Sequence, residues 1–172
     1  MTLRILALCL GLPLLLAACG AEPVWAPDAD VMRARYTSGE TASITLYTVV
    51  NKRSGDGGHT ALMIDGSQRV LFDPAGTFKI ASAPERNDVI FGVNETIRKV
   101  YIDYHARQTY DVLEQKVYVS PDVAEEALRH VGAYGAVNKA LCGNSVSRVL
   151  RRLPGFASIP QTFFPMKISR AF

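Results

Sequence analysis

NKALCGNSVSRVLRRL, residues 138–153, reads as a polar turn followed by an amphipathic helix that begins at Cys142. The apolar residues after the cysteine share one helical face, which predicts that this face packs inward: Val146, Val149, Leu150 and Leu153. Cys142 lies one turn before Val146 on that face, so its sulfur should point at whatever the helix packs against. The dipeptide Pro154-Gly155 then ends the helix.

Two interpretations of Cys142 follow from this position. A cysteine on an inward face can be a small buried apolar residue, which is common in protein cores. The backbone N–H groups at a helix start are unpaired and carry partial positive charge, which favours a thiolate over a thiol. The same position therefore also suits an activated nucleophile, and the helix alone does not decide between the two.

The N-terminus carries the features of a bacterial export signal. Arg4 is followed by an apolar run over residues 5–18 that is too short to span a membrane as a helix. The sequence LAAC at residues 16–19 resembles the lipobox of bacterial lipoproteins. That resemblance implies a signal peptide over residues 1–18, cleavage before Cys19, lipid on Cys19 and anchoring in a membrane. Gly20 at the next position favours the outer membrane, facing the periplasm.

Export and lipidation leave one free thiol in the mature chain. Cys9 leaves with the signal peptide and lipid blocks Cys19, so Cys142 has no partner for a disulfide. A free thiol in an oxidising compartment is liable to oxidation. Its retention there favours a use for Cys142, although a buried structural cysteine remains the alternative.

The mature chain has the length of one domain with a hydrophobic core. Without Arg4 it has 18 Lys and Arg against 16 Asp and Glu, a balance too weak to indicate nucleic-acid binding. Residues 19–40 are rich in proline, aspartate and glycine and are predicted to be a tether from the lipid. Residues 41–172 should then form the folded domain.

A predicted β-hairpin carries the first histidine of the mature chain. Residues 59–64 and 69–73 are two short strands around a turn at 65–67. With a three-residue turn, His59 would lie directly opposite Asp73, and a two-residue turn would shift its partner by one. A carboxylate beside a histidine fixes the tautomer and orientation of the ring, as a catalytic base requires. The alternative is a surface hairpin with an exposed histidine and a turn-capping aspartate.

The remaining segments complete a mixed α and β pattern. Strands are predicted at 43–50, 89–93 and 110–119, and a helix at 120–134 that starts at a serine cap. Residues 94–107 fit either a strand or a helix, and residues 156–172 look irregular. His105 is interpreted as a packing or substrate-contacting residue, and His130 as facing solvent.

Motifs for metals and cofactors are missing from the sequence. It contains no HExxH, no His-x-His and no CxxC, so no zinc site is expected. It also has no glycine-rich phosphate loop after a strand and no GxSxG elbow. The expected cofactor content is therefore none.

His59, Asp73 and Cys142 together resemble the circularly permuted NlpC-like branch of the papain-like cysteine hydrolases, in which the histidine hairpin precedes the cysteine helix. The resemblance implies an α+β papain-like domain with a small antiparallel sheet packed against the cysteine helix. It also implies that Cys142 is the nucleophile, His59 its base and Asp73 the orienting residue. The oxyanion would be bound by the Cys142 backbone N–H with Asn138 or Asn144.

Such a site predicts acyl transfer by a cysteine hydrolase. The compartment favours peptidoglycan peptides as substrate, followed by lipid or protein acyl groups. The alternative functions are a non-catalytic lipoprotein that binds a cell-wall fragment or a partner protein, and a structural outer-membrane assembly factor.

Overall fold

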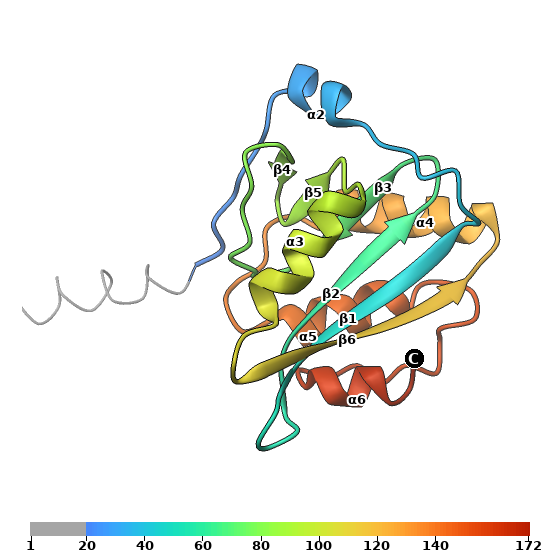
Figure 1. Cartoon of the computed structure of the whole chain (residues 1–172). Helices are drawn as coiled ribbons and strands as arrows, with labels where there is room; N and C mark the ends of the chain where they lie inside the picture. Colours follow the sequence, from blue (N-terminus) through green and yellow to red (C-terminus); the bar gives the residue numbers. More distant parts are fainter. Residues whose placement is uncertain (1–19) are drawn as a thin grey trace, which may run out of the picture.

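Six strands form one antiparallel sheet in the order β4-β5-β3-β2-β1-β6 in a computed structural model that describes residues 20–172 (Figure 1). The strands are β1 (Ser43–Asn51), β2 (Gly57–Asp65), β3 (Arg69–Phe72), β4 (Glu85–Arg86), β5 (Val89–Phe91) and β6 (Tyr110–Tyr118). The helices are α2 (Asp28–Ala34), α3 (Glu95–His105), α4 (Pro121–Gly132), α5 (Cys142–Leu150) and α6 (Pro165–Ser169). The predicted signal peptide at 1–18 and the lipid site at Cys19 lie outside the described residues.

Helices cover both faces of the sheet, and its central strands are therefore buried on both sides. In β1, Ile44 and Leu46 pack against α4, α5 and α6, whereas Tyr47 packs against α3 from the opposite face. This is the alternation that a strand imposes on successive side chains. The mixed α+β class with an antiparallel sheet is therefore confirmed.

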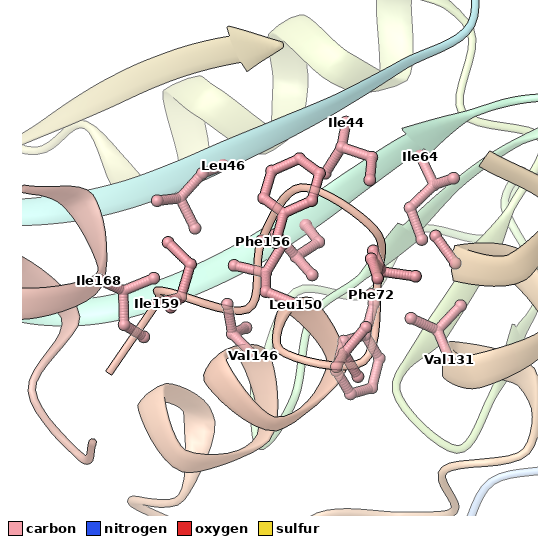
Figure 2. Close-up of a cluster of buried hydrophobic side chains, with 14 of the residues drawn as sticks. Ile44, Leu46, Ile64, Phe72, Val131, Val146, Leu150, Phe156, Ile159 and Ile168 are labelled. Atoms are coloured by element: carbon pink, nitrogen blue, oxygen red, sulfur yellow. The ribbon is translucent and has the colours of Figure 1, made fainter. Parts of the chain in front are cut away.

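The larger core lies between the sheet and α5 (Figure 2). The apolar face predicted for the cysteine helix is buried there: Val146, Val149 and Leu150 are at most 1% exposed. Burying such side chains contributes about 1.5–3 kcal/mol each. The packing of α5 onto β2 therefore fixes the position of Cys142, which begins the helix.

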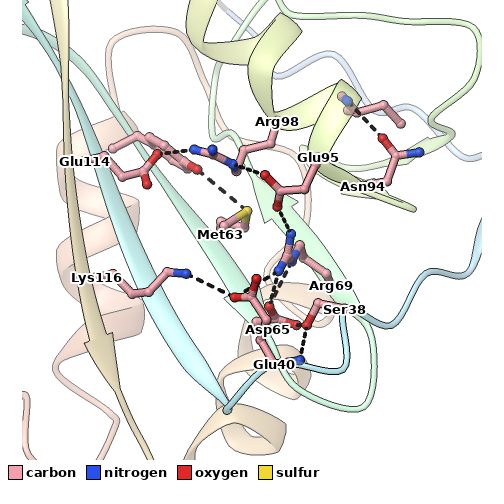
Figure 3. A network of polar contacts seen from close by, with 12 residues as sticks. Ser38, Glu40, Met63, Asp65, Arg69, Asn94, Glu95, Arg98, Glu114 and Lys116 are labelled. Carbon is pink, nitrogen blue, oxygen red and sulfur yellow. Dashed lines mark hydrogen bonds and ion pairs between the residues drawn. The ribbon is translucent and has the colours of Figure 1, made fainter.

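A polar network attaches the first turns of α3 to the opposite face of the sheet (Figure 3). The buried Arg69 guanidinium donates to Asp65 on its own hairpin at 2.9 Å from Nε and to Glu95 of α3 at 2.5 Å from Nη1. Arg98 continues the network from Glu95 to Glu114 of β6. Pairing and hydrogen bonding compensate the cost of burying the Arg69 charge. The later turns of α3 then extend over the end of the sheet at which β2 begins.

Most predicted elements are confirmed, and the ambiguous segment at 94–107 is a helix. The Asn94 side chain accepts the Ile97 N–H at 3.0 Å and so caps α3. The serine cap of α4 is also confirmed, because Ser120 Oγ accepts the Val123 N–H. The structure adds three elements that were not predicted, namely the helix α2, the short strand β4 and the helix α6 in the C-terminal segment.

The described part of the predicted tether, residues 20–40, has local structure of its own. It contains the helix α2, and Trp25 forms a β-bridge with Arg86. The Arg86 guanidinium also lies over the Trp25 ring, 4.6 Å from its centroid. Trp25 is therefore held at β4 by Arg86 although it stays 65% exposed, and α2 buries none of its residues. No helix in residues 20–172 is long and apolar enough to cross a membrane.

Candidate functional site

The site lies where β2 extends beyond its pairing with β3. The two strands pair from Asp65–Arg69 to Leu62–Phe72, so residues 57–61 of β2 pair only with β1. The chain leaves β3 at Asp73, and α5 begins at Cys142 against the uncovered stretch. The Thr60 backbone N–H lies close enough to the Cys142 sulfur to lower the pKa of the thiol. The end of the hairpin and the start of α5 thus meet at one point.

His59 and Asp73 are in contact, although the predicted register is wrong. The turn comprises residues 66–68, so His59 lies beyond the end of the ladder and has no residue of β3 directly opposite. Its Nε2 nevertheless lies 2.7 Å from Asp73 Oδ1. One further step of the same register would place Asp73 opposite Ala61, so His59, two residues away on the same face of β2, is its diagonal neighbour. Only Nδ1 of the His59 ring then remains to face the thiol.

Tyr101 is a member of this site that the sequence did not indicate. Its hydroxyl donates to Asp73 Oδ1 at 2.8 Å, and its ring is almost completely buried. Burial and the neighbouring Asp73 charge hold the pKa of Tyr101 well above its usual range, so the hydroxyl remains a donor. A helix assignment for 94–107 would have found Tyr101, because it then falls on the inward face with Ile97.

The charges in this chain of contacts favour an ion pair between the thiol and the imidazole. Burial raises the pKa of Cys142, but the interaction with His59 and the N–H groups of Thr60 and Gly143 outweigh it, so the pKa is lowered. Burial lowers the pKa of His59, but Asp73 and Cys142 outweigh it and the pKa is raised. Burial likewise opposes ionisation of Asp73, but the hydrogen bond to His59 and its other polar contacts together have the larger effect and the pKa of Asp73 is lowered. All three shifts support thiolate, imidazolium and carboxylate.

His105 packs on the His59 ring, but its side chain takes no part in the contacts that link Asp73 and His59 to the thiol. Its ring stacks on the His59 ring at a centroid distance of 5.4 Å and an interplanar angle of 8°. Its Nδ1 lies 3.0 Å from the Tyr101 carbonyl oxygen, which fixes the ring on the last turn of α3. Burial is the main reason that the pKa of His105 is lowered, which favours a neutral ring. The interpretation as a packing residue fits this geometry.

His59, Asp73 and His105 also offer ligand atoms that lie within 4.8 Å of one another, a group that could hold a metal ion. In this arrangement Asp73 Oδ1 receives His59 and Tyr101 instead, and His105 Nδ1 faces a carbonyl. A metal at this place would have to displace the His59–Asp73 contact.

The two asparagines proposed for the oxyanion lie at different depths. Asn138 is exposed in the turn before α5, whereas Asn144 is half-buried in the first turn of α5. The carbonyl of Asn144 accepts the Gln161 side-chain amide at 2.9 Å. Their oxyanion role remains a prediction, with Asn144 the one that a helix holds near the thiol.

Two glycines allow close approaches that the site depends on. A Cβ on Gly76 would lie 1.8 Å from Asp73 Oδ2, so the turn after β3 can fold under the carboxylate only with glycine there. A Cβ on Gly143 would lie 2.6 Å from the Phe163 carbonyl oxygen, which belongs to the loop over the start of α5. Ser147 Oγ fastens that loop by accepting the Thr162 N–H at 3.2 Å.

Comparisons with protein-family models, with curated proteins and with solved structures found no match to this chain.

Proposed function

We propose that this chain is a lipid-anchored cell-envelope protein that acts as a cysteine hydrolase. The single observation that carries the proposal is the order of contacts in the site. His59 lies between the buried Asp73 carboxylate at 2.7 Å and the Cys142 thiol, with which its side chain interacts. A nucleophile, its base and an orienting group in this order are the requirements of nucleophilic acyl transfer.

The reaction would proceed by two acyl transfers. The Cys142 thiolate attacks an amide or ester carbonyl, and the His59 imidazolium gives its proton to the leaving group as the carbon–heteroatom bond breaks. Water then attacks the thioester while His59 accepts a proton from it. The acid product leaves and the thiolate–imidazolium pair is restored. Asp73 and Tyr101 hold the His59 ring throughout, and N–H groups near the sulfur stabilise the oxyanion.

The arrangement of the domain supports a circularly permuted papain-like fold, in the NlpC-like branch. The strands with His59 and Asp73 precede the cysteine helix in the chain, and the helix packs on the antiparallel sheet. The lipobox-like LAAC at residues 16–19 supports an anchor in the outer membrane. Peptidoglycan peptides are then the substrate that the compartment makes most accessible.

The test is hydrolysis of purified peptidoglycan by the full-length lipidated protein in detergent. New amino and carboxyl ends in the released fragments are identified by mass spectrometry. Cys142→Ala should abolish the release because it removes the nucleophile. His59→Ala should abolish it because a neutral thiol without its base is a weak nucleophile. His130→Ala is the control, since this histidine lies on α4 and pairs with Glu126.

Release that is equal in the wild type and in Cys142→Ala would refute the proposed role of the thiol. Tight binding of peptidoglycan without any cleavage would instead favour the non-catalytic alternative. The anchor is tested separately by mass spectrometry of the native protein. An intact Met1 or an unmodified Cys19 would refute the lipoprotein assignment.

A further inference from the structure

A hollow of about 390 Å³ opens beside His59, where β1 and β2 meet the end of α3 and the start of β6. It is lined by Val49, Gly58, His59, Tyr104, His105, Arg107 and Tyr110. The lining combines aromatic rings with the imidazole of His59. A substrate group placed here would lie beside the imidazole that the proposed reaction uses.

Arg107 gives this hollow its permanent charge. Its Nε donates to the Tyr104 carbonyl at 2.9 Å, and its guanidinium lies 5.6 Å from the Tyr104 ring centroid. Burial lowers the pKa of the neighbouring His105, so that ring adds no positive charge at neutral pH. The side chain of Arg107 is exposed, and the backbone bond uses only its Nε, so its terminal nitrogens remain available to a ligand.

The other arginines that pack on the sheet already have acidic partners. Arg69 is bonded to Asp65 and Arg98 to Glu114, both through side-chain contacts. Within residues 20–172, no carboxylate pairs with Arg107. The nearest acidic residue in the sequence past it on β6, Asp111, is paired with Lys52 at 3.2 Å. A guanidinium that has no acidic partner and lies beside aromatic rings is suited to bind a carboxylate.

We propose that the hollow is a specificity site for acyl substrates that carry a free carboxylate next to the scissile bond, with Arg107 as its recognition residue. This inference rests on the proposed function of Cys142 and His59. The substrate carboxylate would pair with the Arg107 guanidinium, and the apolar part of that substrate residue would pack on Tyr104 and Tyr110. A substrate with an amide in place of the carboxylate would lose that ion pair.

Two alkylating reagents test this without knowledge of the natural substrate. Iodoacetate carries a carboxylate and iodoacetamide is its neutral counterpart, and both attack the Cys142 thiol. Their rates are measured on full-length protein at pH 7 by peptide mapping of Cys142. The ratio of the two rates cancels any change in thiol reactivity that a variant causes.

Arg107→Gln should lower the iodoacetate-to-iodoacetamide ratio about threefold, as loss of a partly exposed ion pair implies. Arg107→Lys keeps the charge and should retain part of the preference. Arg152→Gln is the matched control, because it removes an exposed positive charge beyond the far end of α5. The Arg107→Gln effect should shrink in high salt, since screening weakens exposed ion pairs.

An unchanged ratio in Arg107→Gln, or an equal fall in Arg152→Gln, would overturn the specificity site. Slow reaction of wild-type Cys142 with iodoacetamide, no faster than that of a small-molecule thiol, would refute the proposed function instead. The neutral reagent alone therefore reports on the thiol, and the ratio reports on Arg107.

Discussion

Tyr101→Phe removes one hydroxyl group from the site and leaves the ring that fills the core. In the wild type this hydroxyl donates to Asp73 Oδ1 at 2.8 Å, and Asp73 is only 3% exposed. A hydrogen bond to a charged group contributes about 1.5–3 kcal/mol, and a buried carboxylate that loses a donor has no water to replace it. The free energy of unfolding should fall by that amount.

The assay is urea unfolding near pH 7 together with thermal unfolding. For a domain of this size, a loss of about 1.5–3 kcal/mol corresponds to a fall in Tm of roughly 3–12 °C. Tyr104→Phe is the control, because the Tyr104 hydroxyl bonds to the exposed Thr77 side chain at 2.9 Å. Its effect should stay within about 0.5 kcal/mol.

Tyr101→Phe should also slow alkylation of Cys142, because Asp73 then holds the His59 ring less firmly. Tyr101→Phe should therefore show both a fall in stability and a fall in thiol reactivity, and Tyr104→Phe should show neither. If the two phenylalanine variants unfold at the same urea concentration, the Tyr101 hydroxyl does not hold Asp73 and the reasoning is wrong.

Three further changes test the surroundings of the site. Gly76→Ala should slow iodoacetamide alkylation of Cys142, because its Cβ would displace the Asp73 carboxylate; an unchanged rate would contradict this. Gly143→Ala should lower the free energy of unfolding by about 1–3 kcal/mol, since the Phe163 backbone must move; calorimetry that shows no loss would count against the docked loop. Burial raises the pKa of Asp88 to about 6, so the folded protein loses stability as pH rises through that value. The free energy of unfolding of Asp88→Asn, relative to that of the wild type, should therefore be higher at pH 7 than at pH 5. A difference in Tm between Asp88→Asn and the wild type that is the same at pH 5 and pH 7 would argue against the raised pKa.

Local patterns predicted the elements that hold the nucleophile. The face with Val146 and Leu150 repeats at the helical period and is buried in the structure, because no competing pattern overlaps it. The serine cap before Pro121 likewise marked the start of α4. These signals lie within a few residues of one another, so the sequence alone carries them.

Contacts between distant segments were harder to predict. The turn at 66–68 differs by one residue from the predicted turn, and this shift moved Asp73 out of direct opposition to His59. Their side chains still meet, because the observed register makes them diagonal neighbours on one face of the hairpin. Tyr101 and Arg107 were missed for a related reason. Residues 94–107 alternate well enough for a strand, and only packing of Ile97 and Tyr101 on the sheet selects the helix.

The ion pair between Cys142 and His59 is tested most directly by the pH dependence of Cys142 alkylation. Iodoacetamide reacts with the thiolate, so its rate follows deprotonation of the sulfur. The folded state lowers the pKa of Cys142, chiefly because the His59 interaction outweighs burial. The profile should therefore rise at a lower pH than that of a small-molecule thiol, and the protein should react faster near pH 6.

His59→Ala removes the interaction and leaves burial opposed only by the N–H groups of Thr60 and Gly143. The account predicts that the alkylation profile of this variant shifts to higher pH, to or above the midpoint of the small-molecule thiol. A wild-type midpoint at or above that of the free thiol, or no shift in His59→Ala, would show that Cys142 is a buried structural cysteine.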